Sequence, residues 1–150
     1  MRSSSDLTAQ GLANLAHSFA TANCGSARLF DALGSTIAGE VDNFNAQELS
    51  NAAWSFAVAD AAHDGLWGGD AFLRACDVHA WSKRQLCQLH QWNLWRKEHV
   101  EKRGWEPLPE ELSRRCYEAF VDAGVSPSRL QRQVRAPQTA ARTTATATTT

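Results

Sequence analysis

The hydrophobic positions of two segments, residues 7–22 and 44–59, follow a helical period. In the second segment the apolar residues fall at i, i+3, i+4, i+7 and i+8, namely Leu49, Ala52, Ala53, Phe56 and Ala57. This spacing places them on a single face of an α-helix. The first segment carries the same stripe at Leu12, Leu15, Ala16, Phe19 and Ala20. Each segment therefore predicts an amphipathic helix whose small alanines let a neighbouring helix approach closely.

The two segments are copies of each other. Aligned at an offset of 37 residues, 9 of their 16 positions are identical. Asn45 is the expected N-cap of the second copy, with Glu48 completing a capping box, and Thr8 is a weaker cap for the first. A second helix is expected after each copy, at 27–37 behind the N-cap Ser26 and at about 70–80 behind a glycine-rich break. The unit is a helix–turn–helix of about 37 residues, a length typical of α-solenoid repeats.

The remainder of the chain predicts further helices and then a change of character. A diverged third copy begins near Trp81, with Ser82 as its N-cap, Gln85 lying 38 residues after Gln47, and a helix running to about residue 103. Pro109 suits the start of a helix over 110–122, Gly124 ends it, and Ser126 opens a last helix. Residues 136–150 hold alanine as their only apolar type and predict a disordered tail.

These patterns predict an all-α fold, an α-solenoid of helix–turn–helix repeats. Its expected parts are a first repeat at 6–40, a second repeat at 41–80, a diverged repeat helix at 81–104, a helical cap region at 105–135 and the tail at 136–150.

Charge is uneven along a chain whose net charge is −1. Residues 40–80 carry a local net charge of −6, whereas residues 81–103 carry +4. The total charge therefore does not indicate a polyanionic partner. The local charge of the basic segment does indicate one. The four cysteines form no CxxC pair, which favours a reducing compartment over a disulfide framework. The absence of an apolar run of about 18–20 residues argues against a membrane span.

Several segments of the sequence resemble motifs of one protein family. Gln47–Ala57 resembles the repeat helix of algal octotricopeptide-type proteins, whose pattern is Q-x-L-x-N-x-x-W-x-F-A, and Gln10–Ala20 resembles it with His17 at the Trp position. Leu86–Trp92 is similar to the helix that follows such arrays, and Leu108–Gln131 to the segment that precedes a RAP domain. The resemblance covers about residues 6–135 and includes the related FAST-kinase-like leucine-rich group.

The resemblance implies a protein that binds single-stranded RNA in a mitochondrion or chloroplast and acts in RNA processing, stability or translation. The sequence departs from the family in having few repeats and no RAP domain, so no nuclease-like activity is carried over. Three hypotheses stay open for the function: an RNA-binding repeat protein, a protein–protein interaction scaffold, and a truncated non-functional fragment. A cytoplasmic location is the alternative to an organelle, because residues 1–5 are serine-rich but too few for a transit peptide.

Two sets of residues are candidates for RNA contacts. Gln10, Asn14, Gln47 and Asn51 recur at one position per repeat and would read bases. The alternative is that these amides stabilise the helix stack. In the basic segment, Arg96, Lys97, Lys102 and Arg103 would contact phosphates, with Trp92, Trp95 and Trp105 nearby for base stacking. Here the alternative is a solvated helix end.

Metal and enzyme sites are weaker hypotheses. Cys76, His79, Cys87 and His90 form two pairs with i, i+3 spacing and the ligand set of tetrahedral zinc, although helix packing explains them as well. No catalytic motif such as GxSxG, a Walker loop or HExxH is present, so neither catalysis nor a cofactor is expected.

Overall fold

The computed structural model describes residues 8–124. Over these residues the chain is all-helical, and none of them lies in a β-strand. The elements are α1 (Ala9–Ala22), α2 (Ala27–Glu40), the 3-10 turn η1 (Val41–Asn43), α3 (Ala46–Ala59), the π-helical turn η2 (Asp64–Gly68), α4 (Ala71–Asp77), α5 (Lys83–Arg103) and α6 (Glu110–Asp122). The all-α prediction is confirmed.

Side-chain caps explain where three of these helices begin. Thr8, Asn45 and Ser82 precede α1, α3 and α5, and each side chain accepts a hydrogen bond from the backbone N–H three residues on. Asn45 and Ser82 belong to full capping boxes, completed by the side chains of Glu48 and Gln85. The three caps satisfy backbone donors that a helix start leaves without an intrahelical partner. Each cap also lies 37 residues after the one before it.

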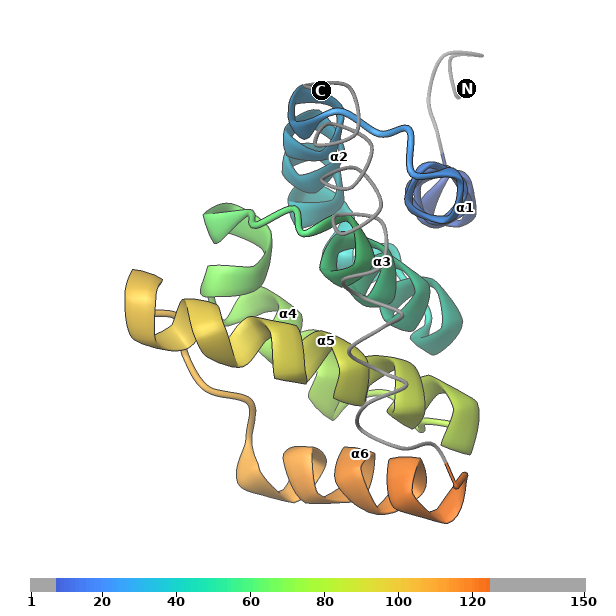
Figure 1. Ribbon diagram of the computed structural model, residues 1–150, viewed down its shortest axis with the longest axis vertical. Helices are drawn as coiled ribbons and strands as arrows, with labels where there is room; N and C mark the ends of the chain where they lie inside the picture. The colour runs from blue at the N-terminus through green and yellow to red at the C-terminus, as the bar shows by residue number, and fades with distance from the viewer. Residues whose placement is uncertain (1–7, 125–150) are drawn as a thin grey trace, which may run out of the picture.

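The helices pack in sequence along one side of the molecule. In Figure 1, α1, α3, α5 and α6 succeed one another from top to bottom, and α1 packs against α3, α3 against α5 and α5 against α6. The connecting elements α2, η2 and α4 lie beside them, with α2 in contact with η2. Among the described residues, the main contacts of α1, α3, α5 and α6 are therefore with the next helix in this order.

The core between these elements is rich in aromatic rings. The rings of Phe30, Phe56, Trp67 and Phe72 meet edge to face in series, with centroid separations of 4.8–5.3 Å. Trp92 of α5 continues the series, 4.9 Å from the Phe72 ring. Edge-to-face contacts add specific geometry to the burial of large apolar surfaces. Leu49, Ala52, Ala53, Phe56 and Ala57, the stripe expected on α3, are all fully buried.

Three sequence expectations need correction. The second helix of the second copy is present as α4 but ends at Asp77, three residues before the predicted end, and the glycine-rich break before it holds the unpredicted η2. The second helix of the first copy runs past residue 37 to Glu40. In the third copy the caps set an offset of 37 and not 38, so Gln85 corresponds to Glu48 in the capping box and Arg84 corresponds to Gln47.

The C-terminal part agrees with the sequence prediction as far as the structure describes it. The helix at 110–122 is confirmed as α6, and Gly124 has the positive φ of 72° expected of a residue that ends a helix. The last helix after Ser126 and the tail at 136–150 lie outside the described residues.

Candidate functional site

A polar groove crosses α1, α3 and α5 on the side of the molecule that carries the repeated amides. Its volume is about 450 Å³, and it is lined by Asn14, His17, Gln47, Asn51, Ser82, Arg84, Gln85 and Gln88. Three of the four amides predicted from the repeat therefore gather in one place. The fourth, Gln10, is exposed on α1 one turn before Asn14 and is not part of the lining.

Residues in the groove and next to it form rows across the three helices because the helices start at a constant interval. One row holds Asn14, Asn51 and Gln88, and a second row holds Gln10, Gln47 and Arg84. A third row holds His17, Trp54 and Gln91. The rings of His17 and Trp54 are stacked, with centroids 5.2 Å apart and an interplanar angle of 29°.

Two hydrogen bonds join α3 to α5 along these rows. Gln88 Nε2 donates to Asn51 Oδ1 over 3.0 Å. Trp54 Nε1 donates to Gln91 Oε1 over 2.7 Å. Asn51 therefore bridges two neighbouring helices, but through the side chain of Gln88 and not through backbone, as the alternative had it. Asn14 makes no side-chain hydrogen bond with any of the residues that the structure describes.

The groove has a mildly positive character. Arg84 is the one cation among its lining residues, and no carboxylate lines it within the described part of the chain. The N-termini of α3 and α5 also lie at the groove, since Gln47 and Ser82 belong to their first turns. The backbone N–H groups there carry partial positive charge, of which the caps take up a part and the Glu48 carboxylate offsets a part at α3.

The basic residues predicted to contact phosphate do not line this groove. Lys97, Lys102 and Arg103 are exposed towards the C-terminal end of α5, outside its lining. Arg103 is engaged with Asp64 of η2, with 3.2 Å between Nη1 and Oδ1. Lys97 and Lys102 have no hydrogen bond or ion pair with the described residues.

Arg96 and Trp92 leave the candidate RNA-binding set because both are fully buried. Arg96 Nε and Nη2 donate to the backbone oxygen of Trp67, over 3.2 and 2.9 Å. Its guanidinium lies 5.3 Å from the centroid of the Trp92 ring and 5.7 Å from that of Trp105. Burial lowers the pKa of Arg96 to about 10. The side chain therefore holds η2 against α5 and cannot reach a phosphate.

The other two tryptophans proposed for base stacking are also unavailable. Trp95 and Trp105 are buried, and their Nε1 groups donate to Asp60 and Asp64 over 2.8 and 2.7 Å. The sequence pattern could not separate buried from exposed rings here, because α5 is covered on two sides, by α3 and by α6.

The four candidate zinc ligands are not assembled into a site. Among residues 8–124 no group of three or more His, Cys, Asp or Glu side chains is placed to hold a metal ion. His90 lies against the rings of Tyr117 and Phe120, and His79 lies against Trp81. Burial raises the pKa values of the Cys76 and Cys87 thiols, which disfavours the thiolate that zinc requires.

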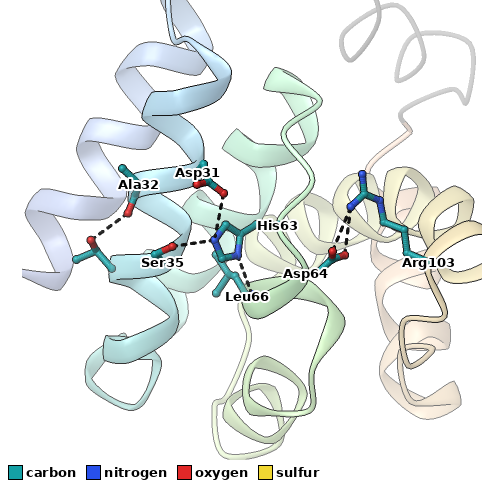
Figure 2. Close-up of polar contacts among 8 residues, drawn as sticks. Asp31, Ala32, Ser35, His63, Asp64, Leu66 and Arg103 are labelled. Carbon is teal, nitrogen blue, oxygen red and sulfur yellow. Dashed lines mark hydrogen bonds and ion pairs between the residues drawn. The ribbon is translucent and has the colours of Figure 1, made fainter.

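A second polar cluster joins α2 to η2, as Figure 2 shows. His63 Nε2 lies 3.2 Å from Ser35 Oγ and 3.8 Å from Asp31 Oδ1. The backbone N–H of Leu66 donates to His63 Nδ1 over 3.0 Å, so the proton of the neutral ring is on Nε2. A serine nucleophile needs an unprotonated ring nitrogen facing its hydroxyl. His63 in this tautomer caps η2 and does not activate Ser35.

Sequence reasoning missed several of these residues. Arg84 and Gln88 line the groove, yet the 38-residue alignment of the third copy put neither in a row with the repeated amides. Extending the offset of 37 residues a second time would have found both. His63 corresponds in the same way to the N-cap Ser26, since it accepts from the third backbone N–H after it. Its role was hidden because histidine is not a usual N-cap.

The comparisons with known proteins identify no relative. No protein-family model, no curated protein and no solved structure matches this chain. The octotricopeptide resemblance therefore rests on the motifs quoted above. In the part of the chain that the structure describes, no helix is both long enough and apolar enough to span a bilayer.

Proposed function

We propose that this chain binds single-stranded RNA in the polar groove over α1, α3 and α5, and that these are the first helices of successive α-solenoid repeats. The observation that carries the proposal is the row of side chains that recurs every 37 residues and opens into one groove. Matching caps at Thr8, Asn45 and Ser82 support the repeat interpretation, because equivalent helix starts give equivalent positions to the residues that follow.

The chemistry of the lining suits unpaired nucleotides. Amide side chains carry both donors and acceptors, and so do the base edges of single-stranded RNA. Arg84 would contact a phosphate, helped by the partial positive charge of the helix starts beside it. Aromatic stacking is a weaker element here, since His17 and Trp54 are half-buried and stacked on each other.

The proposal describes a binding protein without catalytic activity. By its resemblance to octotricopeptide-type proteins, we infer a role in organelle RNA processing, stability or translation. Imaging of the full-length protein with a C-terminal tag tests the location. A signal confined to the cytoplasm would remove the organelle part of the proposal and leave RNA binding untouched.

Fluorescence anisotropy of a labelled single-stranded RNA pool, at low and moderate salt, tests RNA binding. We expect saturable binding that weakens modestly with salt, since Arg84 is the one cation lining the groove and each phosphate contact releases counterions. Replacement Arg84→Ala should weaken binding at every sequence and reduce the salt slope by about one. Arg28→Ala is the matched control, because Arg28 is an exposed arginine on α2 outside the groove.

Two results would contradict this function. One is the absence of binding at tens of micromolar of folded protein, a concentration at which many non-specific nucleic-acid complexes already form. The other is an equal loss in Arg84→Ala and Arg28→Ala, which would indicate general charge attraction and not a site in the groove.

A protein-interaction scaffold is the second candidate. The observation that favours it is the exposed acidic residues of η1 and around α4, among them Asp42, Asp70 and Asp77. Such a surface suits a basic protein partner and repels phosphate. Saturable binding of an arginine-rich peptide, together with no binding of RNA, would favour this function over the first.

A further inference from the structure

The two steps of the groove, α1 to α3 and α3 to α5, differ in how their amides are occupied. At the α1–α3 step, Asn14 is exposed and makes no side-chain hydrogen bond with the described residues. At the α3–α5 step, Gln88 and Asn51 are bonded to each other. The first step therefore offers free hydrogen-bond donors and acceptors. At the second step, part of the hydrogen-bonding capacity of the two amides is already satisfied.

Side-chain length accounts for this difference. Asn14, Asn51 and Gln88 occupy the same position of three helices that start at a constant interval. Glutamine is longer than asparagine by one methylene. Gln88 reaches Asn51 across the gap between α5 and α3, whereas Asn14, on the other side of Asn51, does not bond to it. The third copy thus closes a step that an asparagine would leave open.

An occupied amide is a poor reader of a base. The Oδ1 atom of Asn51 accepts from Gln88 at a partly buried place, so a base must either take the place of Gln88 or fit beside its side chain to use the second lone pair of this oxygen. The exchange of one hydrogen bond for another yields little net free energy. Asn14 requires no such exchange.

Resting on the RNA-binding function proposed above, we propose that Gln88 sets the length of the nucleotide-binding site by closing the α3–α5 step. Base contacts are then confined to the α1–α3 step, where the side-chain amide of Asn14 is free to contact a base. Gln88 is a specificity-determining residue, and its effect on binding is inhibitory.

The substitution Gln88→Asn tests this proposal, because it keeps the amide and removes only the methylene that spans the gap. We expect the variant to bind single-stranded RNA roughly two- to tenfold tighter than the wild type, the range that corresponds to one ordinary hydrogen bond. In a series of labelled oligouridines and oligoadenines of increasing length, the gain should appear only in oligomers longer than the shortest one that saturates the wild type.

Gln91→Asn is the matched control. It makes the same truncation one turn further along α5 and breaks the bond from Trp54, but Gln91 is not part of the groove lining. We expect its RNA affinity to equal that of the wild type. An equal gain in both variants would show that loosening of the α3–α5 contact is sufficient, and would overturn the role of Gln88.

Thermal unfolding establishes that the variants are folded, and Gln88→Ala provides a second route to an open step in a residue that favours helix. It should also bind more tightly than the wild type, by less than Gln88→Asn. If the wild type binds RNA and neither substitution of Gln88 tightens binding, the inference fails and the RNA-binding function stands. If neither the wild type nor the variants bind, both fail.

Discussion

Burial without a charged partner shifts the pKa of two polar side chains on α5. Arg96 is one, held by a backbone oxygen and two indole rings. His90 is another: it is buried on α5, its ring lies 4.6 Å from that of Phe120, and its Nδ1 has no hydrogen-bond partner among the described residues. Burial lowers the pKa of His90, and the charge of Lys97 adds to this.

The lowered pKa of His90 predicts a loss of stability in mild acid. Below about pH 6.5 the unfolded chain binds a proton that the folded chain resists, so the free energy of unfolding falls as the pH falls through this value. Urea unfolding between about pH 7.5 and about pH 5 measures this loss. His90→Phe keeps a ring against Phe120 and removes the titrating group, and should therefore lose less stability over the same range.

His99 does not make this test ambiguous. Its pKa is also lowered, by burial first and by Arg103 next, so some pH dependence should persist in His90→Phe. A pH dependence identical to that of the wild type would show that His90 does not contribute.

At the scale of elements, the contact between α2 and η2 depends on a glycine. Gly34 is buried in α2, and a Cβ atom placed there would lie 2.4 Å from Cδ2 of the His63 ring. The ring cannot move away easily, because Nδ1 caps η2 and Nε2 faces Ser35 (Figure 2). Helix propensity would favour alanine at this position, and tertiary packing excludes it.

Gly34 and Gly39 form a matched pair for testing this contact. Gly34→Ala should lower the free energy of unfolding by roughly 1–3 kcal/mol, as overpacking does. Gly39 lies in the same helix, and a Cβ there would meet nothing within 4 Å. Gly39→Ala should therefore raise the free energy of unfolding by up to about 1 kcal/mol. Urea denaturation of both variants measures these changes in the free energy of unfolding. A stabilising Gly34→Ala would contradict the close contact between Gly34 and the His63 ring.

The N-caps were predictable from local sequence and the π-helical turn was not. Thr8, Ser26, Asn45 and Ser82 act within three residues of their own positions, so the signal is local. In contrast, η2 is fixed by Arg96, which lies 29 residues away and binds the Trp67 oxygen, and by Trp105, whose Nε1 binds Asp64. No local pattern carries such distant bonds.

Across the whole molecule, burial is concentrated on the middle of the helix stack. α3 is covered by α1 on one side and by α5 on the other, and eight of its residues are buried. α1 has α3 and α2 as its neighbours and buries four residues. The free energy of local opening should therefore rise from α1 towards α3, as in assemblies whose elements contact only their neighbours.

Native-state hydrogen exchange measures this gradient directly. We expect the backbone amides of α3 and the N-terminal half of α5 to exchange most slowly and those of α1 to exchange faster. Uniform protection from α1 to α5 would instead indicate a single cooperative unit, and would argue against the repeat interpretation.

The sequence by itself determined the α-helical class, three of the first helices with their caps, and three of the amides that line the groove. These follow from periodicity and capping, which act over a few residues, and from a repeat that places like side chains on like faces. Only the tertiary structure decided which of the candidates are accessible. The sequence pattern predicts a helical position for Arg96, Trp92 and Asn14 but not its exposure. The exposure of a side chain depends on how many neighbours its helix has. α5 is covered on two sides and buries Arg96, whereas the side chain of Asn14 on α1 stays open to solvent.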